Sequence, residues 1–208
     1  MEHNDVIASA GKRRGRPREY DPDQALNRAA DLFWRNGYAA VSLDDIARAT
    51  GMNRPSLAAA FGDKRSLYLR TLERYRDASR AQAVELLSIS KSLRAFLRRF
   101  YAAAIDIYLA GEDVALGCYS IGTAATQAAT DPEVRRFLSD SIRGTDAFLT
   151  DLFRSAAKRG ELHSNANPAG RARVATATLH TLAIRARAGA PRGDLRDIVN
   201  AAVGLLCA

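Results

Sequence analysis

From Asp21 onward, apolar residues recur at helical spacing between residues that begin and end helices. Asp21 is suited to cap a helix with Pro22 at its first position, and Gly37 is suited to end that helix. Signals of the same kind predict further helices at 42–50, 54–61, from 64 onward, 92–111, 117–130, 132–160, 168–189 and 194–207. No segment shows sustained two-residue alternation between hairpin turns, so strands are not needed and we predict an all-α fold.

The charge balance favours a polyanionic partner. Lys and Arg total 31 against 23 Asp and Glu, which gives a net charge of +8 and a sequence pI of about 9.9. Such a basic chain points to nucleic acid before a membrane surface. Hydrophobic residues make up 47% of the 208 residues, which indicates a folded protein. The 2 cysteines exclude a disulfide scaffold, and neither a membrane-spanning stretch nor a secretory segment is evident, so we expect a cytoplasmic protein.

Residues 42–57, with the sequence SLDDIARATGMNRPSL, have the pattern of a helix-turn-helix. Two short helices that cross steeply need a small residue where they touch, and Ala47 is placed there. The turn needs a residue that tolerates positive φ, and Gly51 follows four positions later. Ile46 and Leu57 are expected to bury the inner faces of the two helices against the preceding helix.

In a DNA-binding helix-turn-helix, the second helix enters the major groove by its N-terminal residues. Here these residues are Asn53, Arg54, Pro55 and Ser56. The Arg54 guanidinium can donate two hydrogen bonds to a guanine edge, and the Ser56 hydroxyl can serve a base or a phosphate. The alternative is an αα-hairpin whose polar residues are incidental.

A basic arm, residues 12–18 with the sequence KRRGRPR, precedes the first predicted helix. Its core resembles an AT-hook, because a narrow A·T minor groove attracts arginine and glycine allows close approach of the backbone. Proline then keeps the chain extended. The predicted minor-groove residues are Arg14, Gly15, Arg16, Pro17 and Arg18. The alternative is a solvated charge run that tethers any polyanion.

The C-terminal two thirds of the chain contain candidates for a ligand pocket. Aromatic residues recur at helical spacing, and small residues after Gly117 leave space beside a few polar groups, as in mostly apolar pockets. The candidates are Phe96, Phe100, Tyr101, Tyr108, Cys118, Tyr119, Thr123, Thr126, Gln127, Phe148 and His180. An aromatic stripe also fits an ordinary core, and His180 also fits a core histidine with satisfied hydrogen bonds. Cys118 near a predicted helix start fits a sensor of electrophiles or oxidants, or an inert buried thiol.

The last two predicted helices present apolar faces suited to association. Two such helices from each of two subunits would form a four-helix dimer interface. The predicted interface residues are Ala175, Leu179, Ala183, Leu195, Ile198, Val199, Ala202 and Leu205. The alternative is that both helices only complete the core of one subunit.

The first third of the chain resembles the DNA-binding domain of TetR-family transcriptional regulators. The resemblance rests on Gly37-Tyr38, on residues 42–47 and 51–57, and on residues 61–64, FGDK. It implies a homodimer with an N-terminal three-helix helix-turn-helix domain and a C-terminal helical bundle that binds an effector and dimerises. It also implies phosphate contacts for Ser42 and Lys64, and base-facing positions for residues 53–56.

One departure from the family pattern concerns the middle of the second short helix. The family usually places aromatic or histidine residues there, most often a tyrosine directly after the leucine, whereas this chain has Ala58, Ala59 and Ala60. Alanine cannot donate a hydrogen bond to a phosphate or to an adenine edge. Operator affinity is therefore expected to depend more on Arg54, Lys64 and the basic arm.

Together these features predict a basic arm at 1–19, a helix-turn-helix domain at 20–66, and an effector-binding and dimerisation domain at 67–208. We expect a sequence-specific transcriptional repressor that a small-molecule effector releases from a pseudo-palindromic operator. The alternatives are an architectural DNA-binding protein without an effector and, from another class, a helical small-molecule enzyme. The 3 histidines are well separated, and no metal-ligand spacing, Walker-type loop or nucleophile elbow occurs. We therefore predict no catalytic residue, metal site or cofactor.

Overall fold

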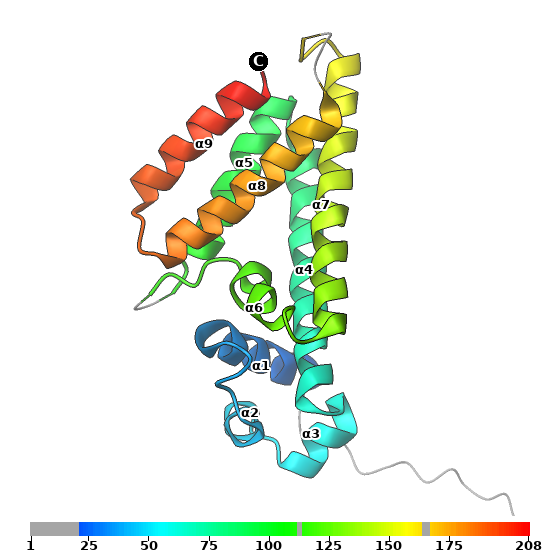
Figure 1. Cartoon of the computed structure of the whole chain (residues 1–208), viewed down its shortest axis with the longest axis vertical. Coiled ribbons are helices and arrows are strands. Elements are labelled where there is room, and N and C mark those ends of the chain that lie inside the picture. Colours follow the sequence, from blue (N-terminus) through cyan, green and yellow to red (C-terminus); the bar gives the residue numbers. More distant parts are fainter. Residues whose placement is uncertain (1–20, 112–113, 164–166) are drawn as a thin grey trace, which may run out of the picture.

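Helices form all the regular secondary structure of the described residues, which are 21–111, 114–163 and 167–208 of a computed structural model (Figure 1). The helices are α1 (Pro22–Asn36), α2 (Leu43–Thr50), α3 (Arg54–Phe61), α4 (Lys64–Ser88), α5 (Leu93–Tyr108), η1 (Ser120–Ala124), α6 (Ala125–Gln127), α7 (Pro132–Lys158), α8 (Pro168–Arg187) and α9 (Arg192–Leu206). The prediction of an all-α fold is confirmed. Among the described helices, none combines the length and the apolar character that a membrane span requires.

The helix boundaries follow from capping contacts that the sequence predicts. Asp21 Oδ1 accepts a hydrogen bond from the Asp23 amide at the start of α1. Ser42 and Asp45 form a reciprocal capping box at the start of α2. Gly51 ends α2 with a φ of 72°, in the left-handed region that favours glycine. The turn between α2 and α3 therefore forms for local reasons.

The segment 117–130 contains the predicted helix, but the helix is shorter and partly π-helical. The π-helical turn η1 continues directly into the short α6, so that the helix covers residues 120–127. Gly117 has a φ of 65°, and a Cβ at this position would lie 2.8 Å from the carbonyl oxygen of Ala183 in α8. Close packing against α8 thus holds the chain in a non-helical turn before η1. The Thr123 hydroxyl also donates to the Tyr119 carbonyl, a bond that often bends helices.

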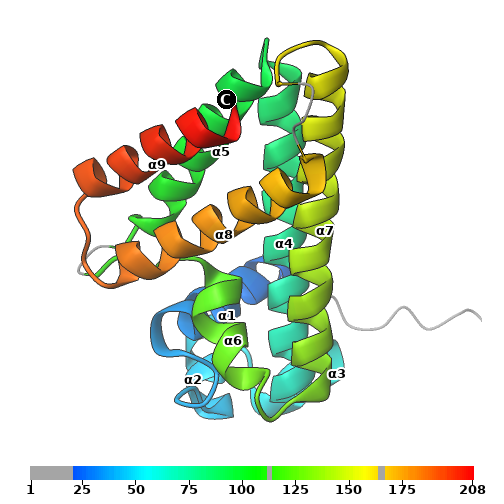
Figure 2. The same ribbon diagram turned by 45° about the horizontal axis from the view of Figure 1, so that its top comes forward.

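The core beneath the helix-turn-helix includes residues from much later in the chain. Phe33 of α1, Ile46 of α2 and Leu72 of α4 are buried in one cluster with Tyr119 and Val134. Figures 1 and 2 both show α6 beside α1. The predicted boundary at residue 66 therefore falls within α4, and residues beyond that boundary complete the N-terminal core.

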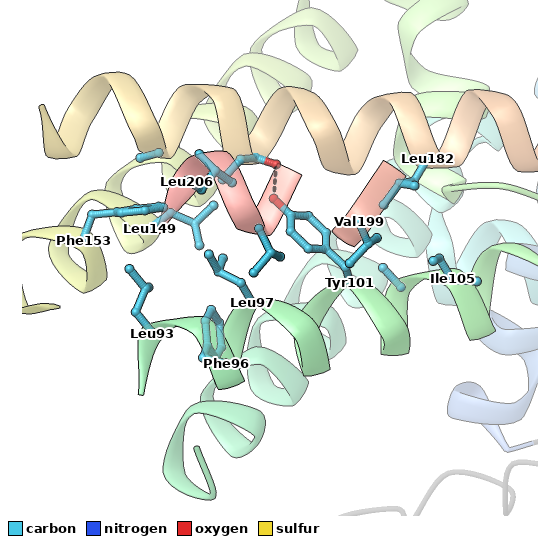
Figure 3. Close-up of a cluster of buried hydrophobic side chains, with 14 of the residues drawn as sticks. Leu93, Phe96, Leu97, Tyr101, Ile105, Leu149, Phe153, Leu182, Val199 and Leu206 are labelled. Atoms are coloured by element: carbon cyan, nitrogen blue, oxygen red, sulfur yellow. Dashed lines mark hydrogen bonds between the residues drawn. The ribbon is translucent and has the colours of Figure 1, made fainter. Parts of the chain in front are cut away.

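A second core lies among α5, α7, α8 and α9 (Figure 3). It buries aliphatic and aromatic side chains from all four helices, among them Phe96, Leu97, Ile105, Leu149, Phe153, Leu182, Val199 and Leu206. Within this core the Tyr101 hydroxyl donates a hydrogen bond to the Ala175 carbonyl oxygen at 2.9 Å. In Figure 1, α3 and α9 lie at opposite ends of the molecule, and the long α4 connects the two regions.

Candidate nucleic-acid interface and effector cavity

The helix-turn-helix exposes the first turn of α3. Ile46 and Leu57 are buried at 0% and 3% relative exposure, so the inner faces of α2 and α3 are held in the N-terminal core. Asn53, Arg54 and Pro55 are exposed beside this fixed base. A rigid scaffold therefore presents the residues that we predicted to face DNA bases.

Several of the predicted DNA-binding residues also fix helix starts. Asn53 Oδ1 accepts a hydrogen bond from the amide of the half-buried Ser56 at 2.8 Å. The exposed Ser42 hydroxyl donates to Asp45 Oδ2 at 2.6 Å and accepts from the Asp45 amide at 3.1 Å. Capping uses the side-chain oxygen of Asn53, so its NH₂ group is the part that can donate to DNA.

The Arg54 side chain is held by a carboxylate of the neighbouring helix. Its Nε donates to Asp44 Oδ1 at 2.6 Å, and its Nη2 donates to Asp44 Oδ2 at 2.5 Å. The guanidinium lowers the pKa of the Asp44 carboxyl, chiefly through these hydrogen bonds, so the pair is charged at neutral pH. Our sequence interpretation missed Asp44, although the turn between two helices at this spacing brings their first turns together.

Of the remaining DNA-contact candidates, Lys64 lies in the described part of the chain and the basic arm does not. Lys64 begins α4 directly after the turn that follows α3, and its Nζ lies 4.3 Å from the ring centroid of Tyr38. Burial lowers the pKa of this ammonium group. The predicted arm residues Arg14, Gly15, Arg16, Pro17 and Arg18 lie outside the described residues.

A cavity of about 340 Å³ is lined by α4, α5, α7, α8 and the segment 118–121. Both ribbon views show α4 and α7 side by side, and exposed residues of these two helices, Asp77, Arg80, Asp140 and Gly144, contribute to the lining. The apolar part of the lining includes Ala83, Phe100, Ala104, Ile107, Leu138, Phe148 and Leu179. This volume is sufficient for a small organic molecule.

The predicted pocket residues divide between this cavity and the cores. Those that line the cavity are Phe100, Tyr108, Cys118, Phe148 and His180. Those that do not line it are Phe96, Tyr101, Tyr119, Thr123, Thr126 and Gln127. Phe96, Tyr101 and Tyr119 are buried in the two cores, where aromatic side chains at helical spacing serve packing, and the buried Thr123 hydroxyl forms a hydrogen bond of 2.7 Å with the Tyr68 hydroxyl. Thr126 and Gln127 lie on α6, and Thr126 is exposed there.

Two tyrosines and a histidine that line the cavity are uncharged at neutral pH. The Tyr75 hydroxyl donates to Cys118 Sγ at 3.6 Å. Burial raises the pKa of the Tyr75 and Tyr108 phenols, so both stay protonated. Burial also lowers the pKa of the His180 imidazole, against the opposing field of the Asp146 carboxylate. The interior therefore suits a ligand that is largely apolar and forms a few hydrogen bonds.

Our sequence interpretation missed the contribution of α4 and the middle of α7 to this cavity. Tyr75, Leu138 and Thr145 line it, but none of them is among the predicted pocket residues. Gly144 of the long α7 also lines the cavity. A Cβ at Gly144 would have no neighbouring atom within 4 Å.

Aromatic contacts join the wall of the cavity to the helix-turn-helix. The Tyr119 ring lies 5.7 Å from the Trp34 ring of α1 and 5.6 Å from the Tyr75 ring of α4, measured between centroids. Trp34 Nε1 donates to the Leu116 carbonyl oxygen at 3.2 Å, and Arg187 of α8 donates to the same oxygen at 2.8 Å. The segment 116–119 thus contacts α1, α4 and α8 together.

An ion pair connects the start of α4, beside the helix-turn-helix, to the start of α7. Arg65 of α4 donates to both carboxylate oxygens of Asp131, at 2.5 and 2.8 Å, and its Nη1 lies 3.1 Å from Glu133 Oε2. Asp131 also caps α7 by accepting from the Glu133 and Val134 amides. Hydrogen bonds from Arg65 lower the pKa of the Asp131 carboxyl to about 2.

Four of the predicted dimer-interface residues are buried within a single subunit. Ala175, Ala183, Leu195 and Val199 are buried in the second core of a single subunit, because α8 and α9 pack on α5 by these faces. Leu179, Ile198 and Ala202 are half-buried, and Leu205 is 77% exposed. Exposed apolar side chains elsewhere on α8 are Val174 and Ile184, at 56% and 61%.

Comparison with known proteins gives a consistent result. The model of the family described as bacterial regulatory proteins, tetR family, matches residues 25–71. The chain is 30% identical over 195 residues to the HTH-type transcriptional repressor ComR of Escherichia coli, covering 93% of this chain and 92% of ComR. It is also 30% identical to the uncharacterized HTH-type transcriptional regulator YezE of Bacillus subtilis, covering 92% of this chain and 99% of YezE. A solved structure of the TetR family regulator CifR, a cysteine mutant complexed with operator DNA, superposes with a TM-score of 0.82 at 27% identity, covering 90% of this chain and 98% of CifR.

Proposed function

The chain belongs to the tetR family of bacterial regulatory proteins, and from this premise we propose that it is a transcriptional repressor released from its operator by a small molecule. It is a DNA-binding transcriptional regulator rather than an enzyme. The observation that carries the rest of the proposal is that α4 follows α3 after a short turn, shares its buried core and then lines the cavity. A ligand in the cavity therefore contacts the helix that supports the DNA-reading surface.

The DNA-binding part of the proposal assigns base contacts to the first turn of α3. Arg54 donates to a guanine, and Asn53 and Ser56 contact neighbouring bases or phosphates. Ser42 and Lys64 contact phosphates on either side, and the basic arm adds contacts in the adjacent minor groove. A homodimer formed through exposed faces of α8 and α9 would place two such surfaces on a pseudo-palindromic operator in the cytoplasm.

The proposed response to effector is a shift between two subunit arrangements. A ligand between α4 and α7 contacts Tyr75 and the wall at 118–121. Displacement of this wall moves Tyr119, whose ring contacts both Trp34 of α1 and Tyr75 of α4. The two recognition helices of the dimer then no longer match successive major grooves, which lie about 34–36 Å apart.

Selection of bound duplexes from a random pool tests the DNA-binding part. We expect enrichment of one pseudo-palindromic sequence, and its placement in a promoter should lower transcription in vitro when the protein is added. Equal recovery of all sequences would favour an architectural DNA-binding protein instead. Activation from the selected site would contradict the assignment as a repressor.

Narrowing the cavity tests the effector part. Gly144→Phe adds a ring at a cavity-lining position where a Cβ meets no atom within 4 Å, so the change should leave the fold intact. We expect this variant to bind the selected duplex normally. Ligands that dissociate the wild-type protein from the duplex should no longer dissociate the variant. Gly193→Phe, on α9 and outside the cavity lining, is the matched control because its Cβ also meets no atom within 4 Å. If ligands dissociate both variants from the duplex equally well, the effector binds elsewhere.

A further inference from the structure

The geometry around Arg54 points to Asp44 as a positioning residue that makes the recognition helix specific for guanine. We propose that Asp44 holds the Arg54 guanidinium so that only its outer edge meets the DNA. The proposal rests on the proposed reading of the operator by α3 and adds the residue that determines what Arg54 can read.

The hydrogen bonds between these two side chains divide the guanidinium into two edges. Asp44 occupies the side edge of Arg54, which is formed by Nε and Nη2. The outer edge, formed by one N–H of Nη1 and one of Nη2, points away from that side because the guanidinium is planar and rigid. Two parallel donors on this edge match O6 and N7 of guanine in the major groove. The pair with Asp44 therefore leaves free the edge that a guanine requires.

The neighbouring charges support a dedicated pair between Asp44 and Arg54. The adjacent acid, Asp45, is occupied by Ser42 and by Arg48, whose Nη1 lies 3.1 Å from Asp45 Oδ1. Each carboxylate at the start of α2 thus has its own arginine. The fixed start of α3, capped by Asn53, keeps Arg54 opposite Asp44.

Stability does not account for this pair. Both side chains are more than half exposed, at 58% for Arg54 and 62% for Asp44, and exposed ion pairs add little to folding. An acid on a DNA-facing surface also opposes binding to phosphates. Its presence is therefore better explained by orientation of the arginine, since a free arginine would contact any nearby phosphate and carry no sequence information.

The test compares base preference with general affinity. Duplexes selected by the wild-type protein define a preferred half-site, and Arg54→Ala identifies the base pair that Arg54 reads as the position where preference is lost. We expect this position to be a guanine. In Asp44→Ala, the preference for guanine over adenine at this position should fall at least about fivefold, against the roughly 5- to 150-fold discrimination of a good bidentate pair. Affinity for a random duplex should stay equal or rise, because a negative charge has been removed.

Further variants separate orientation from folding and from charge alone. Asp44→Asn retains one acceptor oxygen and should lose part of the preference, whereas the Asp44→Ala, Arg54→Ala double variant should lose no more than Arg54→Ala alone. Asp31→Ala breaks an exposed pair of the same kind with Arg35 on α1 and is the matched control, with unchanged base preference expected. Circular dichroism at the binding temperature verifies that each variant is folded.

The outcomes distinguish this inference from the proposed function. If the wild-type protein selects no sequence, the proposed DNA reading fails. The positioning role of Asp44 is overturned, while DNA reading stands, if the protein selects a site but Arg54→Ala does not reduce the preference for guanine at any position. The same conclusion follows if Asp44→Ala raises the affinity for the selected duplex and for a random duplex equally.

Discussion

At the residue scale, the exposed side of α3 is shaped by three successive methyl groups. Ala58 and Ala59 are exposed and Ala60 is half-buried, so the helix can approach DNA closely. Methyl groups contact a thymine methyl but donate no hydrogen bond. The hydrogen-bonding groups of the surface are concentrated instead in the first turn of α3, in Ser42 and in Lys64.

Ala58→Tyr is expected to strengthen binding to the selected duplex at fixed salt, by roughly tenfold. The reason is that the added hydroxyl can donate to a phosphate, and hydrogen bonds to charged groups contribute about 1.5–3 kcal/mol. Fluorescence anisotropy with labelled duplex measures the change. Ala58→Phe supplies the ring without the hydroxyl and should gain less. Unchanged or weaker binding by Ala58→Tyr would show that this side chain does not face the DNA backbone.

At the element scale, α4 is tied to the start of α7 by the Arg65–Asp131 pair and to the segment before η1 by aromatic contacts. The Asp131 carboxylate has two tasks, because it also caps α7. Its pKa of about 2 lies below the ordinary value of 3.8. A carboxyl whose pKa is lowered by folding stabilises the protein above its unfolded pKa, and this contribution is lost as the pH falls towards the folded pKa.

We therefore expect the free energy of unfolding to decrease as the pH falls from about 4 to about 2, and to decrease less steeply in Asp131→Asn. The asparagine retains an oxygen that can cap α7, but it has no charge to lose and does not titrate. Urea unfolding followed by circular dichroism at several pH values measures both slopes. Parallel slopes for the two proteins would mean that other carboxyls account for the acid sensitivity.

At the scale of the whole molecule, the proposed DNA-reading helix α3 and the proposed association helix α9 lie at opposite ends (Figure 1). Val174, Ile184 and Leu205 are large apolar side chains left exposed on α8 and α9 of a single subunit. A second subunit covering them would gain the free energy of apolar burial, about 25 cal/mol per Å². It would also place two copies of α3 on one duplex, so that both half-sites contribute to affinity.

The double variant Ile184→Glu, Leu205→Glu is expected to be monomeric, and its affinity for the selected duplex should fall by at least about tenfold because binding to the second half-site is no longer intramolecular. Sedimentation velocity measures the assembly and anisotropy measures the affinity. Both positions are exposed, so folding should be little affected. Val84→Glu, which changes an apolar side chain of α4 that is 50% exposed, is the control and should remain dimeric. If the Ile184→Glu, Leu205→Glu variant is still dimeric, the interface lies on other surfaces.

The local features of the helix-turn-helix could be predicted from the sequence because short-range chemistry decides them. The Ser42–Asp45 capping box and the left-handed Gly51 depend on residues within a few positions of each other. The all-α fold follows from such caps together with helical periodicity. The tetR family pattern in residues 25–71 extends this information to the role of the surface.

The lining of the cavity and the inward face of α8 could be predicted less well. An aromatic residue at helical spacing looks the same in sequence whether it lines a cavity, as Phe100 does, or fills a core, as Tyr101 does. On α8, Ala175 and Ala183, which we predicted to lie in a dimer interface, pack into the core of the same subunit, whereas the neighbouring Val174 is exposed. Periodicity identifies that a helix has an apolar stripe, but it does not say which neighbour covers it.

The chain's own order of residues determined where helices begin and end, the DNA-reading turn and the excess of positive charge. These properties arise from contacts between residues close in sequence, or from composition alone. Tertiary structure decided the rest: the non-helical turn at Gly117 forced by α8, the walls of the cavity, and the pairing of Asp44 with Arg54. Each of these depends on the distance and angle between helices, which packing of whole side-chain surfaces sets and which no short stretch of residues encodes.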